Sequence, residues 1–286
     1  MRLRSWIFHN FREVSRLFGF EEVDYPVLES ETLFIRKAGE EIRDQLYSFE
    51  DRGNHRVALR PELTPFWLKW LYKRGIGIFL YVAFFLNLKS VSLPLKWFAI
   101  GQCWRSERMT RGRRREHYQW NIDIIGVPGV TAEAELISSI VTFFKRLGIT
   151  SSDVGFKVSS QKVLQEVLQC YSIPEHLFGK VCVIIDKMEK IPLEEIKTEL
   201  GSAGVSEKAI VDLLQVMYVK SLSELEEKLE SAGDAIVELK QLFSLAGKFD
   251  YSEWIQFDAS VIRGLAYYTG VVFEVIFLVL LSSFFI

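Results

Sequence analysis

Cysteine and histidine are scarce in this chain of 286 residues. There are three cysteines, an odd count without CxxC spacing, and four scattered histidines. A disulfide framework needs paired cysteines, and a zinc site needs cysteines and histidines at short spacing. The composition therefore predicts a reducing compartment and no metal site built from protein side chains.

Long apolar runs and an excess of charge of one sign are also missing. The two most apolar stretches, residues 76–88 and 275–286, are both shorter than the roughly 20 residues that span a bilayer. We therefore expect no membrane segment. The formal net charge of −2 argues against nucleic-acid binding by bulk charge. Any anion binding has to come from a local cluster of basic residues.

The N-terminus shows the pattern of a helix and lacks that of a targeting peptide. Apolar residues recur there at helical spacing: Leu3, Ile7, Phe11, Val14 and Leu17. Gly19 is a typical stop signal, and acidic Glu13 is atypical of a transit peptide. We predict a helix that leads into a strand, and no transit peptide within this chain.

Residues 97–126 are the most informative part of the chain, because they predict two strands whose faces differ in chemistry. Successive strand residues point to opposite faces. One face would be bulky and largely apolar, with Phe98, Ile100, Gln102, Trp104, Tyr118, Trp120, Ile122 and Ile124. The other would be small and polar, with Ala99, Gly101, Cys103, Arg105, His117, Gln119, Asn121 and Asp123. Such a sheet can hold a small polar ligand while its back packs on a core.

The loop between these two strands is rich in arginine. From Arg105 to Glu116 there are six arginines, two glutamates and no lysine. The planar guanidinium forms paired hydrogen bonds to phosphate, so the loop favours phosphate binding. A solvated basic loop without a ligand is the alternative.

The rest of the chain predicts strands with helices inserted at irregular intervals. We expect a hairpin around residues 50–54, a helix over 131–147, a strand over 155–160, helices over 223–229 and 235–243, and strand alternation over 254–262. This pattern is typical of an α+β domain built on an antiparallel sheet. We expect a core of residues 1–160 with an atypical insert at 66–88, a helical subdomain at 161–250, a return to the core at 251–274, and an atypical apolar tail at 275–286.

Three separated segments share one chemistry. They are LRPELT at 59–64, WRSER…RGRRREHYQ in the arginine-rich hairpin, and RGLAYYTGVVFE at 263–274. Together with EDRG at 50–53, they resemble histidine–tRNA ligases of the plant organellar or bacterial type, which are class II aminoacyl-tRNA synthetases. The resemblance covers roughly residues 2–65 and 89–274. It implies the class II catalytic domain, an antiparallel sheet flanked by helices, with a helical insertion.

The resemblance also implies a reaction and a set of site residues. Histidine and ATP, with Mg²⁺ held largely by the phosphates, would form histidyl-adenylate, and histidine would then pass to the acceptor end of tRNA(His). The catalytic arginines at the α-phosphate would be Arg105 and Arg263. The histidine-binding residues would be Glu62, Thr64, Gln119, Asp123, Tyr267 and Tyr268. The ATP-binding residues would be Arg105, Glu107, Arg113, Arg115 and His117.

For some of these residues the sequence leaves two roles possible. Arg113 and Arg115 would touch either the outer phosphates of ATP or the tRNA acceptor end, and His117 would close the loop or stack on adenine. Family members often carry glutamate where this chain has Asp123. Cys103 is expected to be a small floor residue, since no base is apparent beside it to activate a nucleophile.

The resemblance further implies a homodimer formed through residues 2–28. It places the full-length parent in the chloroplast or mitochondrion, and a cytoplasmic location is the alternative. Two other functions compete: a non-catalytic histidine-sensing paralogue, like the regulatory subunit of ATP phosphoribosyltransferase, and an inactive dimerisation partner. Arg105 and Arg263 argue against a sensor, because a sensor has no need of arginines at an α-phosphate.

The pattern of the family changes after Glu274, where we find neither motif 3 nor an anticodon-binding domain. We therefore expect the 286-residue chain by itself to be unstable or inactive. The purified chain should show no histidine-dependent ATP–pyrophosphate exchange above that of a heat-denatured sample. Exchange that requires histidine would contradict this expectation.

Overall fold

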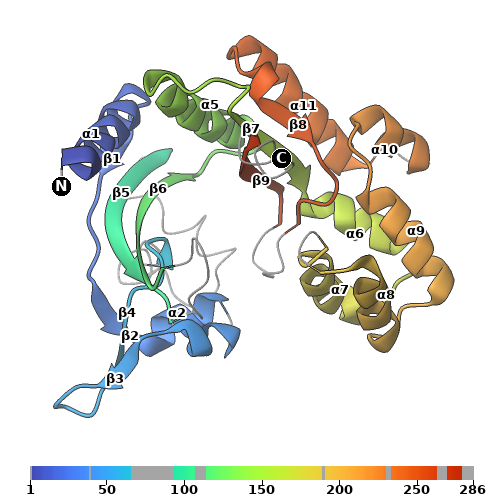
Figure 1. The fold of residues 1–286 in the computed structure, drawn as a ribbon, viewed down its shortest axis with the longest axis horizontal. Coiled ribbons are helices and arrows are strands. Elements are labelled where there is room, and N and C mark those ends of the chain that lie inside the picture. The colour runs from blue at the N-terminus through green and yellow to red at the C-terminus, as the bar shows by residue number, and fades with distance from the viewer. Residues whose placement is uncertain are drawn as a thin grey trace, which may run out of the picture. The chain divides into compact units, whose positions relative to one another are not determined.

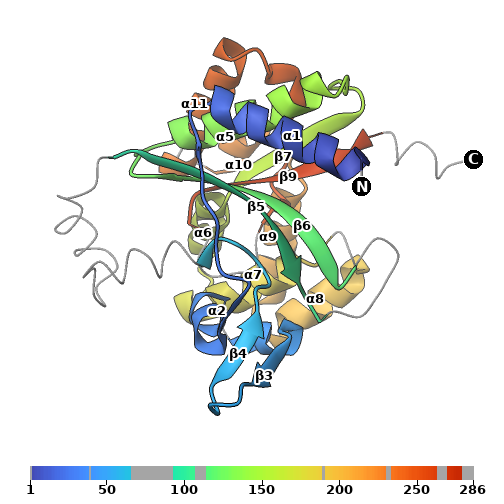
Figure 2. The same cartoon turned by 90° about the vertical axis from the view of Figure 1, so that its left-hand side faces the viewer.

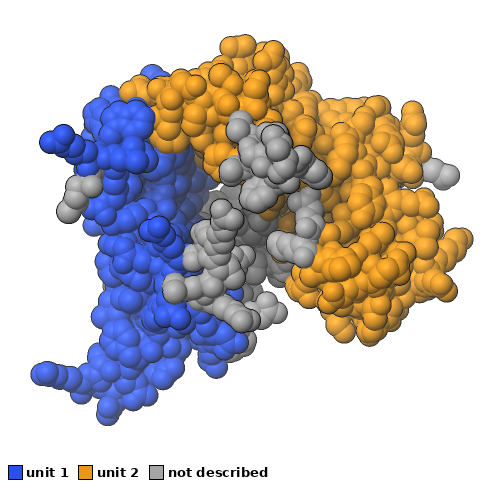
Figure 3. Space-filling model, viewed as in Figure 1, with its two compact units in different colours: residues 1–127 blue, residues 128–286 orange. Residues whose placement is uncertain are grey.

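The computed structural model describes residues 2–38, 40–65, 93–106, 114–188, 191–229, 233–262 and 269–278. The chain divides into two compact units, residues 1–127 and 128–286, coloured separately in Figure 3. Two three-stranded sheets belong to the first unit and one to the second among the described residues. Helices and largely antiparallel sheets occur together, so the predicted α+β class is confirmed.

The first unit starts with helix α1 (Arg2–Leu17), as the apolar spacing predicted. Gly19 follows with φ +73°, a left-handed conformation that glycine adopts without strain and that commonly ends a helix. The next elements are β1 (Glu21–Glu22), β2 (Leu28–Ser30), α2 (Glu31–Ala38) and the 3₁₀ helix η1 (Glu40–Gln45). The predicted hairpin is formed by β3 (Ser48–Glu50) and β4 (Arg56–Leu59), and β2 completes this sheet in the order β2-β4-β3.

A long hairpin of β5 (Leu95–Trp104) and β6 (Glu116–Ile125) forms the second sheet of this unit (Figures 1 and 2). The strands pair antiparallel over ten residues, and β1 pairs parallel with β5. Directly opposed residues lie on the same face. The register puts Gly101 opposite Gln119 and Cys103 opposite His117, so the two predicted faces are confirmed.

Helix α1 packs on the apolar face of this hairpin. The ring of Phe11 stacks on Trp120, with 4.5 Å between centroids, and Phe8 lies 5.2 Å from Tyr118. The indole N–H of Trp120 donates a hydrogen bond to the hydroxyl of Ser15 at 3.0 Å. The expectation that Trp120 serves packing is therefore confirmed, and its partner is the N-terminal helix.

The second unit is organised around strand β7 (Val154–Ser160), which is parallel to β8 (Ile255–Phe257) and antiparallel to β9 (Val271–Phe277). Its helices are α5 (Thr131–Arg146), α6 (Gln161–Cys170), α7 (Phe178–Ile185), α8 (Leu193–Ser202), α9 (Glu207–Met217), α10 (Leu222–Lys228) and α11 (Asp234–Lys248). Two short 3₁₀ turns, η3 (Glu175–Leu177) and η4 (Ser252–Trp254), connect them. No helix in the described parts of the chain is long and apolar enough to cross a membrane.

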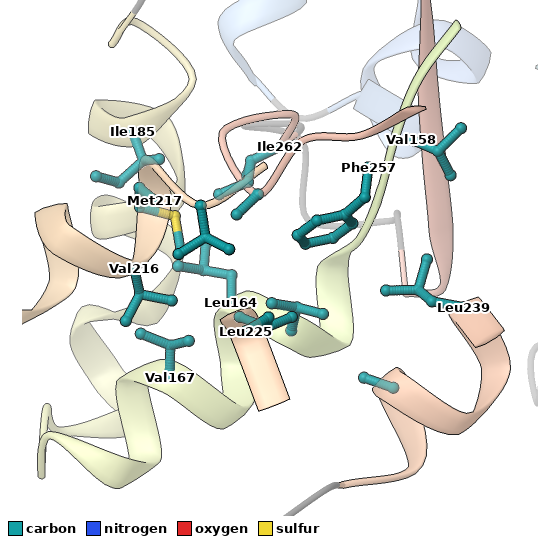
Figure 4. Close-up of a cluster of buried hydrophobic side chains, with 14 of the residues drawn as sticks. Val158, Leu164, Val167, Ile185, Val216, Met217, Leu225, Leu239, Phe257 and Ile262 are labelled. Carbon is teal, nitrogen blue, oxygen red and sulfur yellow. The ribbon is translucent and has the colours of Figure 1, made fainter. Parts of the chain in front are cut away.

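One continuous hydrophobic core joins the sheet and helices of the second unit. Figure 4 shows part of it, with Phe257 of β8, Leu164 of α6 and Met217 of α9 among its buried side chains. The helical segment 161–250 therefore shares its core with β7 and β8. Its status as a separate subdomain stays a prediction.

Two strand boundaries differ from the expected pattern. The alternation over 254–262 predicted a longer strand, but β8 ends at Phe257 because Asp258 turns inward and accepts a hydrogen bond from the backbone N–H of Ser260 at 3.1 Å. Strand β9 reaches further than expected. Residues 275–277 pair with β7, although they belong to the segment that the sequence set apart as an atypical tail.

Asp258 holds a charged cluster at the end of β8. Its side chain is 1% exposed; Lys157 Nζ lies 3.1 Å from Oδ2, and Lys220 and the Ser260 hydroxyl donate to Oδ1. Burial alone would raise the pKa of Asp258. The hydrogen bonds from Lys220, Ser260 and Lys157 outweigh burial, so its pKa lies below the usual range. The ionised carboxylate thus ties the end of β8 to Lys157 of β7 and to Lys220, which follows α9.

We expect Asp258→Asn to lower the free energy of unfolding by about 2–3 kcal/mol, because it leaves two lysines without their buried counter-charge. A folded-state pKa below the unfolded one stabilises the protein above the unfolded pKa of about 4, and this contribution is lost as the pH falls through the folded pKa. Urea unfolding from pH 7 to pH 3 should show the difference between the two proteins shrinking at acid pH.

The matched control is Asp250→Asn, which removes an exposed carboxylate that pairs with Lys145. It should change stability by no more than about 0.5 kcal/mol. A difference for Asp258→Asn that stays constant across the pH range would show that charge does not carry the effect.

Candidate functional site

A short stretch after β4, residues 60–64, lies over the polar face of the β5–β6 hairpin. We call it the covering segment. The approach is closest at Gly101, where an added Cβ would meet Arg60 Nη2 and Leu63 Cδ2, each at 2.8 Å. Because glycine has no side chain, this position lets the covering segment come this near. Two of the three motifs singled out in the sequence therefore meet in space.

Hydrogen bonds hold the covering segment to the hairpin. The backbone N–H of Leu63 donates to Gln119 Oε1 at 3.3 Å, and the Thr64 hydroxyl donates to Asn121 Oδ1 at 3.2 Å. At the other end, Arg105 Nε donates to the carbonyl of Pro61 at 3.3 Å. Three of the predicted site residues, Thr64, Gln119 and Arg105, thus belong to one connected network.

Asp123 marks the acidic end of the polar face. Asn121 Nδ2 donates to Asp123 Oδ2 at 2.5 Å, so that Thr64, Asn121 and Asp123 form a chain of hydrogen bonds. Burial and the negative charge of Asp123 together raise the pKa of Tyr25, whose side chain packs beside the floor of this face. The carboxylate of Asp123 is therefore fixed in place as a hydrogen-bond acceptor.

The opposite end of the face is basic. The backbone N–H of Arg105 donates to the carbonyl of Arg115 at 2.9 Å, which brings the two ends of the arginine-rich loop together. His117 follows two residues later, with Nε2 at 3.4 Å from Gln119 Nε2. Glu62 lies near enough to influence the titration of Cys103.

Cys103 lies on the floor between the two ends and is fully buried. Burial raises the pKa of its thiol to about 11, and the nearby guanidiniums of Arg60 and Arg105 only partly oppose this rise. The thiol is therefore protonated at neutral pH, and Sγ lies 3.5 Å from Gln119 Oε1, to which it donates. These contacts support the expected role of Cys103 as a floor residue.

The polar face is thus ordered along the strands: an acid at Asp123, an amide at Gln119, and guanidinium groups from Arg105 onward. Asp123 and Gln119 are four residues apart, which is about 13 Å along a strand. A ligand that carries a hydrogen-bond donor, a cation and an anion in sequence would match this order.

Five of the predicted site residues lie outside the described residues: Glu107, Arg113, Arg263, Tyr267 and Tyr268. So does the expected insert at 66–88. Within the described parts of the chain, no three histidine, cysteine, aspartate or glutamate side chains are grouped so that they could hold a metal ion.

The cavities formed by described residues include two in the second unit. One, of about 430 Å³, is lined by residues that include Lys145 and Trp254, and the other, of about 370 Å³, by residues that include Lys180 and Glu199. Neither is lined by a predicted site residue.

The sequence analysis missed three residues of this region as site residues. Asn121 carried a usable signal, since it alternates with Gln119 and Asp123 on the polar face. Arg60 stands in a quoted motif, but nothing in the sequence indicates that its guanidinium is buried. Tyr25 precedes a proline in a loop, and its proximity to Asp123 depends on the tertiary fold.

Comparisons with known proteins agree on one family. A family model described as histidyl-tRNA synthetase matches residues 1–278. The chain is 73% identical over 274 residues to the chloroplastic/mitochondrial histidine–tRNA ligase of Arabidopsis thaliana. The matched region covers 96% of this chain and 54% of that relative. It is 34% identical over 277 residues to the histidine–tRNA ligase of Opitutus terrae, covering 95% of this chain and 60% of that relative. The chain therefore spans little more than half the length of these relatives.

Solved structures show the same fold. Histidyl-tRNA synthetase from Nostoc sp. PCC 7120 matches with a TM-score of 0.77 at 20% identity, over 99% of this chain and 63% of that chain. An ATP phosphoribosyltransferase regulatory subunit/histidyl-tRNA synthetase from Bacillus halodurans matches with a TM-score of 0.77 at 18% identity, over 96% of this chain and 69% of that chain. At these identities the likeness shows the fold alone.

We expect Gly101→Ala to displace the covering segment, because its Cβ would clash with Arg60 and Leu63. The free energy of unfolding should fall by about 1–3 kcal/mol in urea denaturation. The control is Gly179→Ala in α7, where an added Cβ meets nothing within 4 Å and a helix gains from the change. Equal stability of the Gly101→Ala variant and the parent would show that the covering segment does not need this contact.

Proposed function

The chain belongs to the histidyl-tRNA synthetase family, and from that premise we propose that it serves the ligation of histidine to tRNA(His). ATP would activate histidine to histidyl-adenylate, and histidine would then pass to the acceptor end of the tRNA. The order of charge along the polar face of the β5–β6 hairpin carries this proposal, since it matches the order of groups in histidine and ATP.

Histidine would lie with its imidazole toward Asp123. The imidazole needs one acceptor and one donor, and the fixed carboxylate of Asp123 can accept from a ring N–H. Tyr267 or Tyr268 would supply the second hydrogen bond. Thr64 and Asn121 support the proposal because they hold Asp123 in place through a chain of hydrogen bonds.

The α-ammonium group would lie at Glu62, Thr64 and Gln119. Gln119 Oε1 already accepts from Leu63 N–H and from the Cys103 thiol, which uses both lone pairs of an amide oxygen. A thiol is a weak donor, so the ammonium group would replace it. Gln119 would thus exchange one bond and keep the other.

The carboxylate of histidine would attack the α-phosphate of ATP at the basic end of the face, and the bond to the outer two phosphates would break to release pyrophosphate. Two anions approach each other in this step, so positive charge at the developing phosphorane should dominate catalysis. Arg105 and Arg263 would supply it. Arg113 and Arg115 would bind the outer phosphates or the tRNA acceptor end, and Glu107 and His117 would contact the nucleotide.

Mg²⁺ would enter with ATP. It prefers oxygen ligands in octahedral geometry and is commonly held by substrate phosphates with few protein groups.

The proposal includes a partner and a location in the cell. Exposed apolar side chains on and near α1, among them Leu3, Trp6, Val27 and Leu28, support a homodimer through residues 2–28. The name of the Arabidopsis relative supports a chloroplast or mitochondrial location for the full-length parent.

We expect the chain to bind L-histidine in isothermal titration calorimetry and Asp123→Asn to weaken that binding by about 10- to 100-fold. The variant loses a hydrogen bond to a charged group, worth about 1.5–3 kcal/mol, and each 1.4 kcal/mol is tenfold in affinity. Asp44→Asn removes an exposed acid from η1 and should leave the affinity unchanged. Unaltered histidine binding by Asp123→Asn would refute the proposed orientation.

A further inference from the structure

Arg60 is almost completely buried, with 4% of its surface exposed. Its Nε donates to the carbonyl of Gln102 at 2.7 Å, and Nη1 donates to the carbonyl of Tyr25 at 2.5 Å. The backbone is fixed as well, because Arg60 N–H donates to Val27 and its carbonyl accepts from Trp104. The guanidinium is therefore held rigidly, and both of its partners are neutral.

No carboxylate in the described parts of the chain lies within ion-pair distance of this guanidinium. Arg56, four residues earlier in β4, shows the usual arrangement, since its Nε lies 3.2 Å from Glu31 Oε2. A buried charge without a counter-ion costs several kcal/mol, so proteins nearly always pair it. Among the described residues, Arg60 is thus a buried cation without a carboxylate at ion-pair distance.

The unpaired side of Arg60 faces the polar face of the hairpin. Its Nη2 and Cζ lie over Gly101, at 2.8 and 3.2 Å from the position of an added Cβ. Gly101 stands opposite Gln119, the residue proposed to hold the ammonium group. The guanidiniums of Arg60 and Arg105 both lower the pKa of the Cys103 thiol, so two cations lie near the same point of the floor.

We propose that Arg60 is a positioning residue whose counter-ion is the anionic group of the substrate, either the carboxylate of histidine or the α-phosphate of ATP. This inference rests on the proposed function. Free histidine is a zwitterion, and a fixed cation attracts its carboxylate while it repels its ammonium group. Arg60 would therefore hold the carboxylate next to the ammonium group, on the side of the floor where Arg105 lies.

The test compares two ligands that differ only in the anionic group. Histidinol has an alcohol where histidine has a carboxylate, and it keeps the imidazole and the ammonium group. Calorimetric titration of the 286-residue chain with each ligand gives a ratio of affinities. We expect Arg60→Gln to weaken histidine binding at least tenfold and to change histidinol binding by less than threefold.

Two further variants separate charge from structure. Arg60→Lys keeps the cation but loses the paired hydrogen bonds, so it should keep the preference for histidine within about threefold. Arg56→Gln removes a guanidinium from β4, four residues before Arg60, and should leave both affinities unchanged. Because each ratio is measured within one protein, a partly folded variant still gives a valid comparison.

A titration with ATP distinguishes the two sources of the anion. A loss of ATP affinity in Arg60→Gln, with an unchanged ratio of histidine to histidinol, would assign the α-phosphate as the counter-ion and support the inference. Equal losses for histidine, histidinol and ATP, or no loss, would show that Arg60 only holds the chain together, and would overturn it. A parent chain that binds neither histidine nor ATP would overturn the proposed function together with this inference.

Discussion

The pairing register of β5 and β6 is the constraint on which the site depends. Side chains alternate between faces along a strand, so a slip of one residue would move every polar group to the apolar side. Contacts on both faces oppose such a slip. On one side Phe11 of α1 stacks on Trp120 and Phe8 packs against Tyr118, and on the other side the covering segment fits only against Gly101.

The polar side chains are held before any ligand arrives, because they are bonded to one another and to the covering segment. Thr64 orients Asn121, Asn121 orients Asp123, and Leu63 fixes the amide of Gln119. Preorganised groups of this kind lose little freedom when they bind a substrate. In the second unit, polar contacts fix the fold itself, because Asp258 holds the end of β8 against two lysines. An extensive apolar core joins the helices of this unit to its sheet.

Local sequence patterns predicted much of the fold and part of the candidate site. Period-two alternation was enough to sort the faces of the hairpin, and helical spacing located α1, α5 and α11. What the sequence could not show depends on distant partners. Strand β8 ends where the buried carboxylate of Asp258 turns inward, and β9 extends further because it pairs with β7. Arg60 is buried because its guanidinium donates to the carbonyls of Gln102 and Tyr25. The family was identifiable because three weak motifs occurred together, although no single one specified the chemistry.

The burial of Arg60 has a consequence for the response to ionic strength. Dissolved ions screen charges that water reaches, with a Debye length of about 8 Å at physiological salt, and they screen buried charges much less. Arg115 is exposed at the edge of the arginine-rich loop, whereas Arg60, the first residue of the covering segment, is buried. Added salt should therefore weaken the attraction of the arginine-rich loop for a polyanion. It should have little effect on the binding of a small zwitterion to Arg60. Under the proposed function, rising salt would separate the binding of tRNA from the binding of the amino acid.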